Sequence, residues 1–435
     1  MNSPTLPANV PPALLAPFVI LLLLIAFGPL CFPGAWNRHY PKVAFTLAVF
    51  VVAWCIFGLR EPAQVWETTQ AYFSFIILIG SLFVVSGGIH ITVKGEATPL
   101  ANVAFLLAGA IVSNLLGTTG ASMLLIRPWL RMNQYRVTAH HVVFFIFIVS
   151  NVGGCLTPIG DPPLFLGYLM GMPFWWPARH CLPMWALGVG VLLAMFYAID
   201  RRNYSRAPAA IRQKETASGE WRFGGLSNLL FLAVILAATA LDQPPFARET
   251  LMLAAAAGSW FTTSQDVHKS NHFNFHPIKE TAILFAGIFA TMIPALGWLQ
   301  VNVTHLPQTG PTFFYFGTGG LSSVLDNAPT FLCFLKTAMG LFGDPRAAGS
   351  FGRNEIDMAL LLGNAKTQNC VLAISIGSVF FGANTYLANG PNLMVKAIAD
   401  QQKVRTPNFL AYVWKYSIPF MLPMLVLVWW LFFRN

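Results

Sequence analysis

The sequence predicts an all-α integral membrane protein made of two inverted-topology repeats, and three observations lead to this prediction. Hydrophobic residues occupy 56% of the 435 positions and charged residues only 10%, whereas roughly a quarter of the residues in soluble domains are charged. Apolar runs of about 20 residues, the length that spans a bilayer as a helix, recur along the chain. Other apolar runs are longer and are broken near their middle by polar residues, glycine and proline.

The simple apolar runs predict complete membrane crossings in both halves of the chain. They cover 14–32, 42–59, 72–93 and 181–199 in the first half, and 226–241, 250–261, 278–298 and 412–433 in the second. The broken runs are of two kinds. Those at 99–131 and 311–342 predict re-entrant hairpins, and those at 140–171 and 369–399 predict crossings that are unwound at mid-membrane.

The order of these runs repeats along the chain. Each half holds five complete crossings and one hairpin that returns to its own side, and an odd number of crossings forces the second half into the opposite orientation. We expect the first repeat at 1–200, a cytoplasmic linker at 201–225 and the second repeat at 226–435. Inverted repeats with paired broken helices are typical of secondary transporters, whose substrate site lies where the repeats meet.

The basic residues lie mainly in the short connections between apolar runs. The loop at 200–223 is the most basic of these, which predicts an outside N-terminus and a multi-pass protein of a bacterial-type plasma membrane. This distribution explains the net charge of +10 by lipid and membrane orientation, so we expect no nucleic-acid partner. The six scattered cysteines suggest neither disulfides nor a metal cage, and we expect no cofactor. No Walker loop, HExxH motif or nucleophile elbow occurs, so an enzyme is not expected.

Two carboxylates lie within the broken regions, Asp161 in the first half and Asp326 in the second. A carboxylate in a partly dehydrated site can hold either a proton or a cation, and competition between Na⁺ and H⁺ for one such group is sufficient for antiport. Hydroxyl and amide side chains around the same breaks offer the oxygen ligands that small cations need. These further candidates are Ser113, Asn114, Ser150, Asn151, Thr157, Ser323, Asn327, Asn384, Thr385 and Asn389.

Each candidate also has a purely structural interpretation. Asp161 precedes two prolines, which is the pattern of a helix N-cap, and Asp326 can cap the helix that follows the second hairpin tip. The amide and hydroxyl side chains can simply satisfy broken backbone. His268, His272 and His276 have helical spacing in a polar connection, and their role is left open.

Four stretches of the chain carry a family resemblance. They read SNLLGTTGASMLLIRP from Ser113, HHVVFFIFIVSNVGGCLTPIGDPPLFLG from His140, SSVLDNAPTFL from Ser322 and GANTYLANGPNLMVKAIA from Gly382. The sequence resembles the NhaD-like sodium:proton antiporters of the ion-transporter superfamily, which also contains arsenite permeases and di- and tricarboxylate carriers. The resemblance implies paired hairpins, a homodimer, and an ion site at Ser113/Asn114, Ser150/Asn151, Asp161, Ser323, Asp326/Asn327 and Asn384.

Two functions from this superfamily therefore compete. The first is Na⁺(Li⁺)/H⁺ antiport by alternating access, with Na⁺ and H⁺ bound at the residues above. The second is Na⁺- or H⁺-coupled transport of a carboxylate such as citrate, or of an oxyanion such as arsenite. Carboxylate carriers resemble one another in a Ser-Asn-Thr motif at both tips, whereas here the first tip reads Ser-Asn-Leu and the second holds Asp326, which favours the first function.

Overall fold

The computed structural model describes residues 10–92, 97–206, 222–239, 241, 244, 246–271, 273–303, 310–344 and 353–434. Helices make up nearly all of this part of the chain, and its one sheet is an antiparallel pair of short strands, β1 (His90–Thr92) and β2 (Arg222–Gly224). Seven of the described helices are long and apolar enough to cross a membrane. The predicted all-α membrane protein is confirmed.

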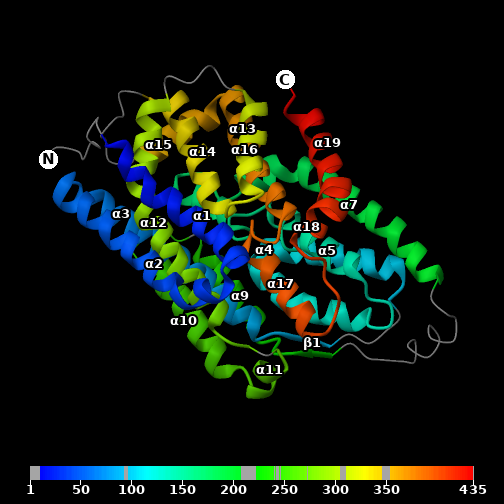
Figure 1. Ribbon diagram of the computed structural model, residues 1–435. Helices are drawn as coiled ribbons and strands as arrows, with labels where there is room; N and C mark the ends of the chain where they lie inside the picture. The colour runs from blue at the N-terminus through cyan, green and yellow to red at the C-terminus, as the bar shows by residue number, and fades with distance from the viewer. Residues whose placement is uncertain are drawn as a thin grey trace.

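Three helices from each half of the sequence form one bundle, here called the scaffold bundle (Figure 1). Within it, α12 packs along α2 and α3, and α10 packs along α3 and α9. Tyr72 of α3 donates a hydrogen bond to the carbonyl of Ala282 in α12, which joins the two halves directly. The six helices are α1 (Ala16–Cys31), α2 (Pro33–Ala53), α3 (Pro62–Gly87), α9 (Asn228–Ala238), α10 (Ala247–Thr262) and α12 (His276–Asn302).

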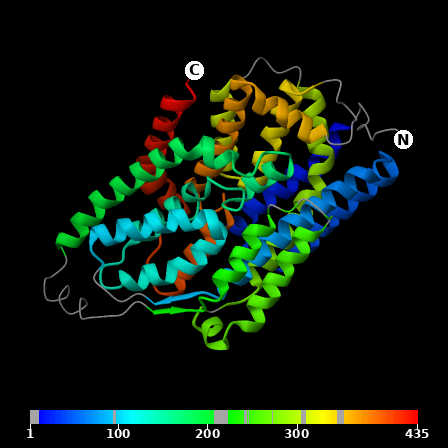
Figure 2. The same ribbon diagram turned by 180° about the vertical axis from the view of Figure 1, so that it is seen from behind.

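Most of the other described helices, both long and short, form a second bundle beside the first, here called the broken-helix bundle (Figure 2). The first half contributes α4 (Pro99–Met132), α5 (Ala139–Ile148), α6 (Pro162–Leu169) and α7 (Trp176–Arg206). The second half contributes α13 (Pro311–Ser322), α14 (Asn327–Phe342), α15 (Arg353–Gly363), α16 (Ala365–Phe381), α17 (Gly390–Gln401), α18 (Phe409–Tyr412) and α19 (Leu422–Phe432). The short α11 (Gln265–Ser270) connects α10 to α12.

Both predicted hairpins turn back on themselves. In α4 the backbone leaves the helical conformation at Gly117, with φ 73° and ψ 155°. The two arms of α4 then lie side by side, since Asn102 and Asn133 exchange side-chain hydrogen bonds of 2.8 and 3.0 Å. In the second half, α13 and α14 pack against each other across the turn that ends at Asp326. The re-entrant placement of these hairpins in a bilayer stays a prediction.

The broken helices form the centre of the second bundle. Every residue of α5 from Val142 to Ile148 is fully buried, and so is most of α16 after Cys370. Helices that are apolar on all sides are buried in the interior of a protein. α5 ends where the sequence turns to Ser150-Asn151-Val152-Gly153-Gly154, and the chain becomes helical again at Pro162, a residue suited to the first turn of a helix.

Several helices extend beyond the predicted crossings: α2 begins at Pro33 instead of 42, and α3 begins at Pro62 instead of 72. α7 continues to Arg206 beyond the predicted end at 199, because Asp200 is buried and paired instead of lying in a polar loop. The polar stretch after the second hairpin contains α15, whose Asp357 is buried. The repeat boundaries and the orientation in the membrane stay predictions.

Candidate functional site

Asp161 is the centre of a polar network that joins both halves of the chain. Its side chain is fully buried, and although it occupies the N-cap position of α6, it makes no capping hydrogen bond. Thr118 Oγ1 donates to Asp161 Oδ1 at 2.9 Å, Asn389 Nδ2 donates to the same oxygen at 3.2 Å, and Asn327 Nδ2 donates to Oδ2 at 2.7 Å. The capping explanation is therefore wrong for Asp161.

The network extends from Asn389 to the other broken helix. Asn389 Nδ2 also lies 3.1 Å from Asn151 Oδ1 and 3.3 Å from the carbonyl oxygen of Ser150. Asn151 Nδ2 in turn donates to Asn392 Oδ1 at 2.7 Å. Asn392, which the sequence analysis missed, holds the second break together by donating to the carbonyls of Gly382 and Thr385. Its spacing of three residues after Asn389 was the signal in the sequence.

The two halves make equivalent contacts at their hairpin tips. The backbone N–H of Thr118 donates to the carbonyl of Gly160 at 2.8 Å, and that of Asn327 donates to the carbonyl of Ala388 at 3.2 Å. Thr118 and Asn327 are 209 positions apart, and Gly160 and Ala388 are 228 apart. Offsets of this size are those at which the hydropathy pattern repeats, so each tip rests on the unwound backbone of its own half in the same way.

A second pair of equivalent contacts involves predicted site residues. Thr157 Oγ1 donates to the carbonyl of Asn114 at 2.6 Å, and Thr385 Oγ1 donates to the carbonyl of Ser323 at 2.8 Å. Asn384 Nδ2 donates to Ser323 Oγ at 2.9 Å. The two threonine hydroxyls satisfy broken backbone, as their structural interpretation predicted, whereas Asn384 is bonded to a side chain. All of these groups lie beside the Asp161 network without touching its carboxylate.

Asn114 and the two serines of the first half have similar local roles. Asn114 Nδ2 donates to the carbonyls of Ala110 and Gly153, and its Oδ1 accepts from the N–H of Leu156. Ser113 Oγ donates to the carbonyl of Ala110, and Ser150 Oγ is bonded to Ser122 Oγ. All of these side chains are buried, so the first tip is locked onto the first break.

Asp326 has a different environment from Asp161. It is only partly buried, and its Oδ1 accepts the N–H of Ala328 at 3.0 Å as the N-cap of α14. The neighbouring Asn327 connects the two carboxylates, because its side chain is bonded to Asp161. Asn327 Oδ1 has no hydrogen-bond partner among the described residues although it is buried. Asp326 is thus next in sequence to a residue that contacts the carboxylate of Asp161.

A cavity of about 930 Å³ lies between the scaffold bundle and the broken-helix bundle and reaches this site. Its inner end is lined by Thr119, Asp326, Asn327 and Asn389. Its outer end reaches the surface, where exposed residues such as Asn274, His276 and Gln401 line it. Gly390, the first residue of α17, faces open space in which an added Cβ would meet no atom within 4 Å. The N-terminus of α17 is therefore accessible from the cavity.

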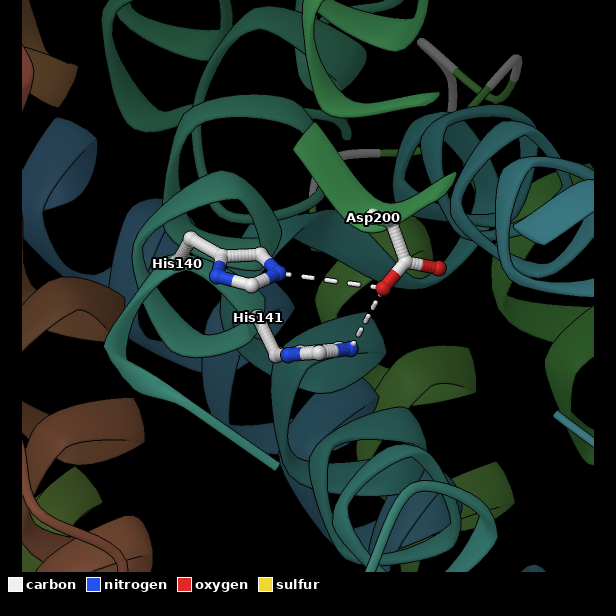
Figure 3. A group of neighbouring side chains, drawn as sticks. All are labelled: His140, His141 and Asp200. Carbon is white, nitrogen blue, oxygen red and sulfur yellow. Dashed lines mark ion pairs between the residues drawn. The ribbon is translucent and has the colours of Figure 1, made fainter. Parts of the chain in front are cut away.

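A further cluster of polar side chains, which the sequence analysis did not select, lies at the ends of α4, α5 and α7 (Figure 3). His140 Nε2 and His141 Nε2 lie 3.7 and 3.1 Å from Asp200 Oδ1. Arg136 also pairs with Asp200. Burial alone would lower the pKa of Arg136, but the hydrogen bond and charge of Asp200 raise it above its ordinary value.

The geometry of this cluster favours an ion pair over a metal site. The guanidinium of Arg136 already occupies both oxygens of Asp200, so a cation would face a positive charge. The backbone N–H of Thr138 donates to His141 Nδ1 at 3.3 Å, which leaves the proton of the neutral ring on Nε2, the atom that faces Asp200. A protonated ring nitrogen cannot bind a metal ion. The cluster ties three helix ends together.

Other basic candidates lie away from the carboxylates. Lys336 contacts Asn354 and does not pair with Asp326. His268 packs against Trp260, with ring centroids 4.6 Å apart, and His276 lies 3.9 Å from Glu280. His272 lies outside the described residues. No ligand set joins His268 and His276 in the part of the chain that the structure describes.

A multi-pass helical protein in which broken helices meet beside a cavity belongs to the class of membrane transporters and is not an enzyme. A family model described as "Putative citrate transport" matches residues 7–433, nearly the whole chain. The protein therefore belongs to this family of secondary transporters within the ion-transporter superfamily. No curated protein matches the chain. The match supports the superfamily that the motifs indicated but gives no support to its NhaD-like branch.

Proposed function

We propose that the protein is a cation-coupled transporter of small di- or tricarboxylates, with citrate as the first candidate, that works by alternating access. The observation that carries this proposal is the cavity of about 930 Å³ that ends at Asp326 and Asn389. Sites for small organic ligands measure about 300–1,000 Å³. A cavity of this size fits a carboxylate with its hydration shell, whereas a sodium ion needs only a few oxygen ligands at close range.

The inner end of the cavity can attract an anion. The half-helices α14 and α17 both begin there, and Asn327 and Gly390 belong to their first residues. Helix N-termini carry unpaired N–H groups and a positive partial charge, so they favour carboxylates. The negative charge of Asp326 opposes this attraction, because Asp326 lines the same end of the cavity.

This repulsion supplies a mechanism that couples substrate binding to the binding of a proton or cation. A substrate carboxylate near Asp326 is repelled unless a proton or a cation neutralises Asp326. Asp161 offers a second position, because its buried carboxylate is bonded to Asn389, which also lies beside Asn151 Oδ1 and the carbonyl of Ser150. It is also bonded to Asn327, whose Oδ1 has no partner among the described residues. Na⁺ or H⁺ bound at these groups would then enter together with the substrate, so each gradient can drive uptake.

The alternating step follows from the two bundles. The tips of both hairpins contact the breaks through Thr118 and Asn327, so the tips and the unwound backbone form one connected unit in the broken-helix bundle. Rocking of this unit against the scaffold bundle would open the cavity to the other side, with both hairpins re-entrant in the bilayer. The exposed apolar residues of α2, among them Phe45, Val49 and Phe50, suit lipid or a second copy in a homodimer.

Na⁺(Li⁺)/H⁺ antiport is the second candidate. One observation favours it, the complete burial of Asp161 among neutral donors and oxygens, because a single buried carboxylate is sufficient for exchange of Na⁺ against H⁺. We rank carboxylate transport first because of the family description and the size of the cavity, whereas the sequence motifs favoured antiport.

Uptake of radiolabelled citrate into proteoliposomes tests the proposal. We expect saturable uptake that depends on an inward Na⁺ or H⁺ gradient, and loss of this gradient dependence in Asp326→Asn. Asp400→Asn is the matched control, because Asp400 is exposed, pairs with Lys396 and does not line the cavity. Absence of citrate and succinate uptake, together with Na⁺-dependent proton movement reported by a pH-sensitive dye, would replace carboxylate transport by antiport.

A further inference from the structure

Arg127 is the one arginine or lysine among the described residues that line the cavity. It is partly buried in the second arm of α4, and it makes no hydrogen bond or ion pair with any residue in the described part of the chain. The neighbouring Arg136, by contrast, is fully engaged by Asp200. A partly buried guanidinium without a partner is costly, so such a group indicates a partner that comes from outside the chain.

The other charged groups of the cavity do not provide this partner. Glu280 lies beside His276 at 3.9 Å, and Asp326 caps α14 through Ala328. Among its described lining residues, the cavity therefore contains one free guanidinium, and its inner end is formed by helix N-termini. These are two separate points at which a negatively charged ligand can be held.

Helix geometry places the two points along one wall. Thr119, Met123 and Arg127 line the cavity at intervals of four residues, so they follow a single face of α4. Thr119 lies at the inner end, next to Thr118, which is bonded to Asp161. The Cα atoms of Thr119 and Arg127 are about 12 Å apart along the helix. Long side chains on a helix point toward its N-terminus, which brings the Arg127 guanidinium back toward the inner end.

We infer that Arg127 binds one carboxylate of the substrate while the inner helix N-termini receive another, so that Arg127 selects di- and tricarboxylates over monocarboxylates. A guanidinium binds a carboxylate through two parallel hydrogen bonds, which a lysine cannot reproduce in the same geometry. A monocarboxylate can satisfy only one of the two points. This inference rests on the proposed carboxylate transport and adds the residue that determines its substrate class.

Kinetics of citrate uptake by Arg127→Gln, Arg127→Lys and Arg131→Gln test the inference. Arg131 is the matched control, since it lies one turn further along α4, is exposed and does not line the cavity. We expect Arg127→Gln to raise KM for citrate at least about tenfold, which corresponds to about 1.4 kcal/mol, with a smaller change in the maximal rate. Arg127→Lys should fall between the wild type and Arg127→Gln, and Arg131→Gln should match the wild type.

Inhibition by added monocarboxylate supplies the specificity readout. Acetate should compete with citrate weakly in the wild type and relatively better in Arg127→Gln, because the variant has lost the second point of attachment. An unchanged KM for citrate in Arg127→Gln overturns the inference, and so does an equal effect of Arg131→Gln. Absence of citrate uptake by the wild type instead overturns the proposed function itself.

Chemical protection keeps the inference testable if Arg127→Gln does not fold. Phenylglyoxal modifies arginine side chains, and mass spectrometry of the wild-type protein can follow Arg127 and Arg131 separately. Citrate should slow the modification of Arg127 and leave that of Arg131 unchanged. Equal modification rates of Arg127 with and without citrate would overturn the inference.

Discussion

Replacement of Asp161 by asparagine should leave the fold intact and abolish cation coupling. The carboxylate accepts from Thr118, Asn327 and Asn389. Asparagine has the same shape, and its NH₂ group can occupy the place of Oδ2 if the Asn327 amide flips, because Asn327 Oδ1 has no partner among the described residues. The variant can therefore remake the three bonds of Asp161 while it loses the charge, and the flip exchanges an unpaired buried oxygen of Asn327 for an unpaired NH₂ group.

Asp161→Leu is the matched variant, and it should lower the stability of the fold. Leucine has a similar volume but leaves the amide donor of Asn327 without its acceptor. Asn389 Nδ2 keeps Asn151 Oδ1 and the carbonyl of Ser150, and the Thr118 hydroxyl can rotate toward another acceptor. An unsatisfied buried donor costs about 1–3 kcal/mol, and the Asn327 amide is one such donor in this variant. We expect Asp161→Leu to unfold at a clearly lower temperature than Asp161→Asn.

Thermal unfolding in detergent and citrate uptake into proteoliposomes measure the two effects separately. Asp161→Asn should unfold closer to the wild-type temperature than Asp161→Leu does, and it should show no dependence of uptake on a Na⁺ or H⁺ gradient. Wild-type gradient dependence in Asp161→Asn would show that the charge of Asp161 has no role in coupling. Equal destabilisation by asparagine and leucine would refute the amide flip.

Two further predictions concern the framework of the site. Gly117→Ala should destabilise the protein by about 1–3 kcal/mol, because φ is 73° and the new Cβ would lie 3.2 Å from a backbone oxygen, whereas Gly190→Ala has open space around it and should stabilise α7 by about 0.5–1 kcal/mol. Asp200→Asn should cost about 3–5 kcal/mol because it leaves a buried guanidinium unpaired, whereas Asp400→Asn breaks an exposed pair and should cost about 0–1 kcal/mol. Thermal unfolding measures all four, and equal shifts within either pair would contradict the reasoning.

Much of the fold could be predicted from hydropathy. Residues that must span a bilayer have to be apolar over a helix length, and the four breaks were visible because glycine, proline and asparagine interrupt such runs. The end of α7 could not be predicted, because an aspartate such as Asp200 is expected in a polar loop. Only the structure shows that Arg136 and the two histidines lie beside it. A buried charge is recognisable in a sequence only when its partner is known.

The site could be predicted only in part, because the sequence does not show which side chains meet. Asp161 and Asn327 were selected because they lie at breaks, and the structure brings them together with Asn389. Periodicity could not show that Asp326 caps a helix while Asp161 does not, because both precede a helix start. The cavity, and the position of Arg127 in its lining, could not be predicted either, because a cavity depends on how α4, α12 and α17 pack and not on any local pattern.

The equivalent contacts of the two halves have a consequence for how the site arose. Thr118 corresponds to Asn327, and by the same offsets Asp161 corresponds to Asn389. An internal duplication would have begun with the same residue at both members of each pair, so that two carboxylates, or two amides, faced each other across the site. Two carboxylates would have repelled, and two amides would have carried no charge. Under such a duplication, divergence of one copy would give the mixed pair that the structure contains, in which the amide of Asn389 donates to the carboxylate of Asp161 at 3.2 Å, so that Asp161 is held by both halves.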